Sequence, residues 1–150
     1  MGQLIIVIVL IGLGYVVGSI AEKKHYRSII SREAQLLHIP TVSVKNMIKD
    51  DVDIIDARMV QGSVVISIDH FKRILASLRN IFGGKVTAYE SLIDRARREA
   101  ILRMKEKSPN ADIVLNTRIE TSTIGRSANS RKSIGSIEAM AYGTAVSYRK

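Results

Sequence analysis

The stretch that decides the fold is DHFKRILASLRNIFGGKVTAYE, residues 69–90. Before the pair Gly83-Gly84 its apolar side chains recur at helical spacing, which predicts an amphipathic helix that runs up to the pair. Glycine readily adopts the left-handed conformation that ends a helix, so we expect the pair to stop this one. Thr87 and Glu90 then have the spacing of a capping box, which predicts that a second helix opens at Thr87.

The second helix has an apolar stripe on one face and basic residues off it. The stripe consists of Tyr89, Leu92, Ile93, Ala96, Ala100 and Met104. A stripe of this kind packs against a sheet or another helix. Leu102 falls nearly opposite the stripe, where it is either one exposed leucine, which is ordinary, or part of a contact between subunits.

Strand patterns lie on both sides of these two helices. Before them, residues 52–60 and 63–68 are rich in β-branched side chains, with a turn or bulge signal at Gly62 between them. After them, residues 113–121 alternate as a strand does, and a last strand is expected over 134–148. This order predicts an α+β fold, in which a small antiparallel sheet has two helices packed on one face.

The beginning of the chain reads as a membrane segment, because residues 1–21 contain no charged side chain. A helix of about twenty residues rises about 30 Å, the thickness of a bilayer core. A cleavable signal peptide is the alternative, since Ser19 and Ala21 are small, although no positive region leads the segment. Gly14 and Gly18 are four residues apart, a spacing that lets helices pack closely in lipid.

Basic residues follow this segment at once and would set its orientation. They are Lys23, Lys24, Arg27 and Arg32, and nothing basic precedes the segment. The positive-inside rule then places the N-terminus outside and the rest of the chain in the cytoplasm. The sequence therefore predicts a single-pass protein of the bacterial inner membrane.

Three parts make up the expected chain. They are a transmembrane helix over 1–21, a juxtamembrane stalk or linker over 22–50, and an α/β domain over 51–150. The net charge of +9 lies in the last two parts. Basic groups beside an anionic leaflet gain about 1 kcal/mol each, but keeping the domain soluble and setting the topology explain most of this charge. We expect no nucleic-acid partner, because only 2 Phe, 5 Tyr and no Trp are available for base stacking.

Chemistry-bearing residues are few and do not form a known constellation. The chain has no cysteine, which excludes disulfides and thiolate metal sites. Its histidines are His25, His38 and His70, and no two are spaced as ligands on one helix face. His70, beside Asp69, is the remaining metal candidate. No nucleophile motif occurs, so we expect no catalytic residue, no cofactor and no enzymatic activity.

A set of short motifs, in this order, resembles the YbjQ-like family of small bacterial proteins over about residues 52–147. The motifs are Gly62-Ser63-Val64-Val65, Gly83-Gly84-Lys85, Tyr89-Glu90, Ala96-Arg97-Arg98-Glu99-Ala100, Asn110-Ala111-Asp112-Ile113-Val114, Ile124-Gly125 and Gly143-Thr144-Ala145-Val146. The resemblance implies a dodecin-like subunit that closes into a pentameric ring, and it brings the family's label of heavy-metal binding. It also makes Gly83, Gly84, Tyr89 and Gly143 markers of the fold.

These observations predict a non-enzymatic membrane protein whose cytoplasmic domain forms a homo-oligomeric ring. The ring would act as a scaffold or as an accessory component of a membrane assembly, with lipid and other membrane proteins as partners. The alternative is a module that binds a metal or a small anion at subunit interfaces or in a central pore. The sequence names neither the ligand nor the partner.

Overall fold

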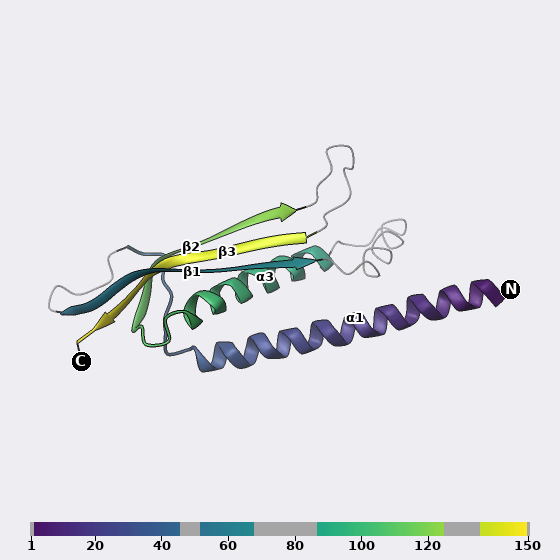
Figure 1. The fold of residues 1–150 in the computed structure, drawn as a ribbon, viewed down its shortest axis with the longest axis horizontal. Coiled ribbons are helices and arrows are strands. Elements are labelled where there is room, and N and C mark those ends of the chain that lie inside the picture. The colour runs from purple at the N-terminus through teal and green to yellow at the C-terminus, as the bar shows by residue number, and fades with distance from the viewer. Residues whose placement is uncertain (1, 46–51, 68–86, 125–135, 150) are drawn as a thin grey trace.

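The computed structural model describes residues 2–45, 52–67, 87–124 and 136–149. These residues form helix α1 (Gly2–Gln35), strand β1 (Ile54–Ser67), helix α3 (Thr87–Glu106), strand β2 (Ile113–Ile124) and strand β3 (Ser136–Tyr148). Helix α3 lies between the sheet and α1, so the elements form layers (Figure 1). The predicted α+β fold with an antiparallel sheet is confirmed.

The sheet has three strands in the order β1-β3-β2, each antiparallel to its neighbour. The sequence predicted two short strands before the helices with a break near Gly62, and this prediction is wrong, because β1 is continuous. Gly62 pairs with Ala141 within the ladder. A Cβ atom on Gly62 would lie 2.4 Å from Ala100 O and 2.4 Å from Met104 N. The glycine is therefore required where the α3 backbone approaches the strand, rather than for a turn.

The outer edge of β2 is covered at its start by residues 41–44. Val42 N donates to Val114 O at 2.9 Å, and Thr117 N donates to Val42 O at 2.9 Å. Between these contacts β2 shifts its register, and Asn116 has φ 51°, a left-handed conformation that asparagine tolerates better than most residues. The irregular turn of backbone thus lets the incoming chain join the sheet.

Gly143, one of the predicted fold markers, lies in β3 beside this irregular part of β2. A Cβ atom there would lie 2.8 Å from Val114 Cγ1 and 2.9 Å from Leu115 O. These distances are too short for a real side chain, so the position needs glycine for close packing between the two strands.

The core lies between α3 and the sheet. Its buried members include Val60, Val64, Leu92, Ala96, Ala100, Met104, Ile137, Ala139 and Ala141. The predicted stripe of the second helix is thereby confirmed at Leu92, Ala96, Ala100 and Met104. Alanines contribute to the contact from both sides, Ala96 and Ala100 from the helix and Ala139 and Ala141 from the sheet, which lets the helix lie close to the strands.

Leu102 has a different environment from either of the two that the sequence suggested. It is 2% exposed, so it is not a surface leucine. It lies on the side of α3 that meets α1, three residues after Glu99, which pairs with Arg32 of α1. A second element of the same chain therefore covers Leu102, and no subunit contact is needed to explain its burial.

Several predicted features fall outside the described residues. They include the first amphipathic helix, Gly83, Gly84 and His70, as well as the boundary near residue 50. Helix α3 is described from Thr87, and because the residues before it are outside the description, the predicted helix start stays a prediction. Tyr89 belongs to its first turn, but the position of the Tyr89 side chain is likewise outside the description.

Helix α1 runs through residue 21 without a break and ends at Gln35. Among the described residues, no helix has the length and apolar character that crossing a membrane requires. This finding contradicts the predicted single-pass placement in the inner membrane, with its outside N-terminus and cytoplasmic domain. The second half of α1 contains Lys23, Lys24, Arg27 and Arg32, and it packs on α3 rather than forming a free stalk.

Candidate functional site

The densest group of charged side chains in the described residues joins α1 to α3 and centres on Glu99. Glu99 is 3% exposed. Its Oε2 atom pairs with Nη2 of Arg32, and its Oε1 atom accepts from Nε of Arg103 at 2.9 Å. His25 Nε2 lies 3.6 Å from the same Oε2 atom. A buried carboxylate is thus compensated from both helices, as a buried charge requires.

A second group lies further from the sheet and is built around Arg98. Arg98 donates from Nε and Nη2 to the two carboxylate oxygens of Glu33, at 2.8 and 2.6 Å. Asp94, one turn earlier on α3, lies 3.6 Å from Arg98 Nη1. The fork-to-fork geometry fixes both distance and orientation between the helices.

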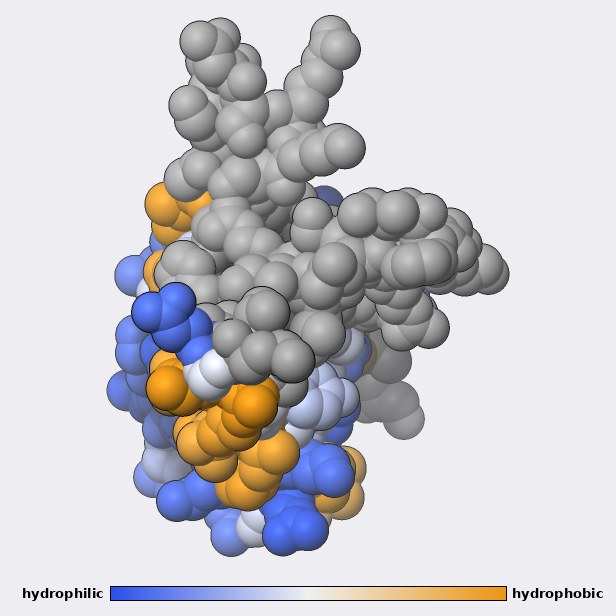
Figure 2. All heavy atoms as spheres, turned by 90° about the vertical axis from the view of Figure 1, so that its right-hand side faces the viewer, coloured by the Kyte–Doolittle hydropathy of each residue, from blue (hydrophilic) through white to orange (hydrophobic). Residues whose placement is uncertain are grey.

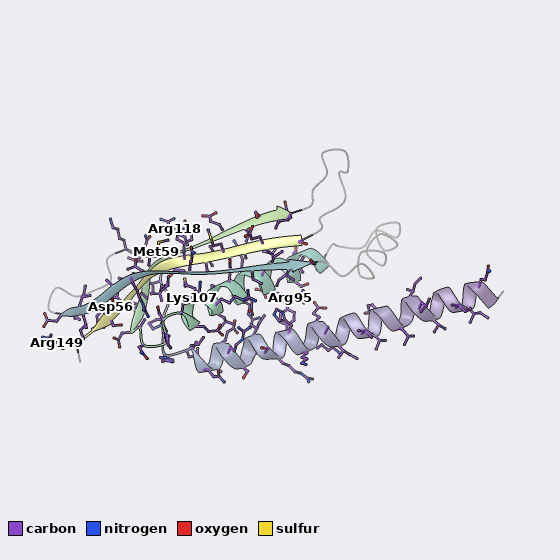
Figure 3. The ribbon with its side chains drawn as sticks, in the orientation of Figure 1. Asp56, Met59, Arg95, Lys107, Arg118 and Arg149 are labelled. Carbon is purple, nitrogen blue, oxygen red and sulfur yellow. The ribbon has the colours of Figure 1, made fainter. Side chains whose placement is uncertain are left out.

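A third group lies nearer the N-terminal end of α3, where Figure 3 labels Arg95 between the two helices. The guanidinium of Arg95 lies 6.0 Å from the ring centroid of Tyr26, within the range of a cation–π contact. Arg95 Nη1 is also 3.9 Å from Glu22 Oε1. Tyr26 donates its hydroxyl proton to Ser91 O at 3.0 Å.

Apolar side chains fill the space between these charged groups. Ile29 of α1 is fully buried, and Leu102 of α3 is nearly so. Ile29 lies three residues before Arg32, and Leu102 lies three residues after Glu99, so each shares a helix face with a paired charge. The interface therefore has the composition of a permanent contact, with an apolar centre and charges that select one register.

The surroundings shift the pKa values of the acidic groups downward. Burial raises the pKa of Glu99, but the hydrogen bonds from Arg32 and Arg103 outweigh it, and the net pKa is below its usual value. The hydrogen bonds from Arg98 lower the pKa of Glu33. Both carboxylates are therefore charged at neutral pH.

Burial is also the main cause that lowers the pKa of His25, and the positive charge of Arg95 adds to it. Arg32 and Arg103 act in the same direction, while Glu99 opposes them. His25 is therefore neutral at pH 7, with its ring beside a carboxylate that two arginines already neutralise.

Acidification is expected to weaken the docking of α1 in two steps. The folded-state pKa of His25 lies below 6.5, so its contribution to stability is complete above pH 6.5 and is lost as the pH falls through the folded value. The lowered pKa values of Glu33 and Glu99 give a second loss below about pH 4.5. Urea unfolding between pH 7.5 and 3 should show the midpoint fall in both ranges. In His25→Gln the first step should disappear, and a midpoint that is independent of pH would contradict these assignments.

The arrangement around Glu99 is suited to holding two helices together rather than to catalysis. Both carboxylate oxygens of Glu99 are already paired, so neither is available as a general base or a metal ligand. His38, the other described histidine, contacts only main-chain oxygens, at Gln35 and Pro109. Within the described ranges no three His, Asp or Glu side chains converge as metal ligands do.

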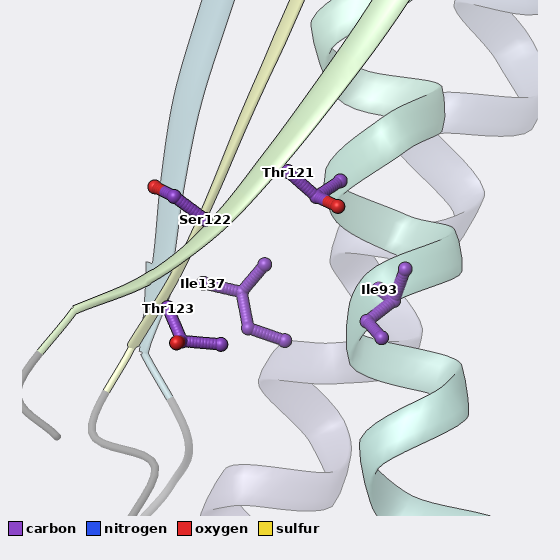
Figure 4. A pocket seen from close by; sticks show the side chains of 5 residues that line it. All are labelled: Ile93, Thr121, Ser122, Thr123 and Ile137. Atoms are coloured by element: carbon purple, nitrogen blue, oxygen red, sulfur yellow. The ribbon is translucent and has the colours of Figure 1, made fainter.

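A pocket of about 420 Å³ lies between α3, the C-terminal end of β2 and the N-terminal end of β3. It is lined by Ile93, Thr121, Ser122, Thr123 and Ile137 (Figure 4). Hydroxyl and aliphatic groups can accept a neutral, partly apolar molecule. None of these side chains carries a charge.

The structure separates the site residues that the sequence singled out. Gly14 and Gly18 lie in α1, on the row of side chains that continues through Glu22 to Tyr26. Arg32, predicted to set topology, instead pairs with Glu99.

The contacts between α1 and α3 join residues such as Glu33 and Arg98 that are 65 positions apart, and sequence reasoning missed them. The available signal was the second stripe on α3, in which Arg95, Arg98, Leu102 and Lys105 share one face.

Comparison with known proteins assigns most of the chain. A family model with the description "Putative heavy-metal-binding" matches residues 41–149, a range that begins after α1 ends. The chain is similar to a "UPF0145 protein" of Hahella chejuensis, with 36% identity over 113 residues that cover 74% of this chain and 95% of the relative. It is similar to a second "UPF0145 protein", of Psychrobacter arcticus, with 41% identity over 90 residues, or 59% of this chain and 52% of the relative. A relative from Dehalococcoides mccartyi is 39% identical over 92 residues, which cover 59% of this chain and 79% of that protein.

Proposed function

This chain belongs to the YbjQ family, described as "Putative heavy-metal-binding", and from that premise we propose that it is a non-enzymatic subunit of a homo-oligomer. Copies of the α/β domain join through the outer edge of β1 and form a ring that acts as a scaffold. The observation that carries this proposal is the long edge of β1, which has no partner strand among the described residues.

Strand β1 lies at the border of the sheet and is 14 residues long. In the part of the chain that the structure describes, it pairs with β3 alone. A free edge of this length presents a row of backbone donors and acceptors, which natural proteins cover, interrupt or pair with another strand. The edge strand of a second copy supplies the complementary groups.

Exposed apolar side chains lie next to this edge, on the sheet face that α3 does not cover. Met59 and Val65 of β1 are 73% and 54% exposed. Met140 of β3, also exposed, lies opposite Ser63 in the register and therefore shares their face. Figure 3 shows Met59 and Arg118 on this side of the sheet. An apolar strip beside a free edge supports a contact with another protein chain.

The two borders of the sheet differ, which favours head-to-tail assembly over a symmetric pair. The start of β2 is covered by residues 41–44, whereas its last residues, such as Ser122 and Thr123, are exposed. Contact between β1 of one copy and β2 of the next joins two different surfaces, and such contacts form a ring when the rotation closes. The resemblance to pentameric proteins implies five copies.

The double variant Met59→Lys/Val65→Lys is expected to dissociate the assembly. Lysine on an edge strand opposes strand pairing, and loss of two apolar contacts weakens the interface. We expect the apparent dissociation constant to rise by about 100-fold or more, because burying one such side chain contributes about 1.5–3 kcal/mol. Size-exclusion chromatography with light scattering, over a concentration series, measures the change.

Leu37→Lys is the control, because it places one lysine at an exposed leucine away from the sheet. This variant should keep the mass of the wild-type assembly. If the double variant also keeps that mass at every concentration, the β1 surface is not the subunit contact.

A second candidate is a module that binds a metal or a small anion at the subunit interfaces or in the central pore. The family description favours the metal, and 23 basic against 14 acidic side chains favour the anion. No metal site forms within the described part of one chain, and in a homo-oligomer the copies can share the ligands. Native mass spectra of the wild type and of His70→Ala separate the candidates, since each bound ion adds its mass to the assembly.

A further inference from the structure

The N-terminal half of α1 projects past the interface that holds its C-terminal half. Among the described residues, hydrogen bonds and ion pairs between α1 and α3 begin at Glu22. Before that point the helix carries large apolar side chains that are about half exposed or more. Figure 2 looks at the molecule from the end where α1 projects and shows an orange apolar patch bordered by blue hydrophilic residues.

Five of the exposed side chains of this half have the spacing of a heptad seam. Ile6, Leu10, Leu13, Val17 and Ile20 are spaced by four, three, four and three residues, and each is more than half exposed. This spacing forms one continuous seam along a helix and is the pattern by which two helices pack knobs into holes. Ile5, Val9 and Val16, also exposed, border the seam.

The seam points away from the domain to which α1 belongs. Leu13 lies nine residues before Glu22, and Val17 lies nine residues before Tyr26. Nine residues make about two and a half helical turns, so each pair lies on opposite faces. Since Glu22 and Tyr26 face α3, the seam faces away from α3, and another molecule can reach it without displacing α1.

We propose that this seam binds the same seam of α1 in a second copy of the chain, as a short two-helix coiled coil. The interface lies outside the family match, which begins at residue 41. It is separate from the β1 contact proposed above and does not depend on it. It also uses a different face of α1 from the row that contains Gly14 and Gly18.

The amount of exposed apolar surface is sufficient for such a pair. Each Ile, Leu or Val offers roughly 60 Å² or more of apolar surface. The eight seam and border residues on each of two copies would therefore remove about 1,000 Å² from water, close to the lower limit of specific interfaces. The seam has no charged residue, so two copies of this positively charged chain do not repel each other along it.

Disulfide cross-linking tests the pairing, because the chain has no cysteine of its own. Leu13→Cys places a thiol at the centre of the seam, where the two copies meet in either helix direction. Tyr15→Cys is the matched control, since Tyr15 is 48% exposed and lies on the other side of α1. In the full-length protein under mild oxidation, we expect at least about five-fold more covalent dimer from Leu13→Cys, because the bond forms only where Cα atoms approach to about 7 Å.

Cross-linking in a chain that lacks the β1 contact distinguishes pairing through α1 from pairing through β1. Both cysteine variants are made in the Met59→Lys/Val65→Lys chain, where the preference for Leu13→Cys should persist. Equal cross-linking at both positions, or none at either, would overturn the pairing. A third arm adds phosphatidylcholine vesicles: if the chain binds them and the Leu13→Cys dimer is lost, lipid covers the seam and the proposal is wrong.

Discussion

Replacing Gly62 by alanine is expected to destabilise the protein by about 3 kcal/mol, because the added methyl group overlaps the backbone of α3. The added Cβ atom would lie 2.4 Å from both Ala100 O and Met104 N. These are backbone atoms of α3, so no side-chain rotation can relieve the overlap. The helix must move away from β1, which loosens the alanine-rich contact around Ala96 and Ala100.

Urea unfolding followed by circular dichroism measures this loss. Gln61→Ala is the matched control, because Gln61 is the preceding residue of the same strand and its side chain is exposed. It should change the free energy of unfolding by less than about 0.5 kcal/mol. A Gly62→Ala protein as stable as this control would show that α3 does not pack on β1 as described.

The second large effect is expected from Arg32→Gln, at about 3 kcal/mol of lost stability. The variant removes one of the two guanidinium groups that compensate the buried carboxylate of Glu99. Breaking a buried pair by removing one partner typically costs about 3–5 kcal/mol, because the other charge stays buried. We expect the lower end of that range, since Arg103 remains beside Glu99.

Hydrogen exchange shows which part of the structure is destabilised and by how much. Amides of α1 around Ile29 should lose protection in Arg32→Gln, while those of β3 should keep most of theirs. Arg27→Gln is the control, because Arg27 is an exposed arginine of the same helix. Unchanged protection around Ile29 in the Arg32 variant would mean that the ion pair does not hold α1 in place.

The parts of the fold that the sequence predicts well are those where a local pattern has a single structural meaning. Leu92, Ala96, Ala100 and Met104 repeat at helical spacing, and all four are buried against the sheet. The alternation that predicts a strand from Ile113 onward likewise corresponds to β2. Such patterns reflect contact with one partner layer, so they can be interpreted without knowing what that layer is.

Gly62 shows where local interpretation fails. A glycine between two β-branched runs is typical of a turn, and the sequence was divided there into two strands. In the structure β1 is continuous, and the glycine is explained by α3, whose Ala100 and Met104 backbone lies against it. The residues that require a glycine here are therefore some 40 positions away along the chain, and no local sequence pattern includes them.

The α1–α3 interface was missed for a related reason. The charged residues that build it, such as Glu33, Arg98 and Glu99, have individually ordinary roles on solvated helix faces. Only the docking of α1 brings Glu33 to Arg98 and Arg32 to Glu99. Leu102, nearly opposite the predicted stripe, belongs to the second stripe on α3, and that stripe was the local sign that α3 is covered on two sides.

The central claim is that this domain is a subunit of a homo-oligomer assembled through the free edge of β1. Native mass spectrometry of the full-length wild-type chain tests it most directly. We expect one main species containing more than two copies, with five copies in each ring if the family resemblance extends to the assembly, and loss of that species in Met59→Lys/Val65→Lys. A wild-type protein that remains monomeric at every concentration would contradict the claim.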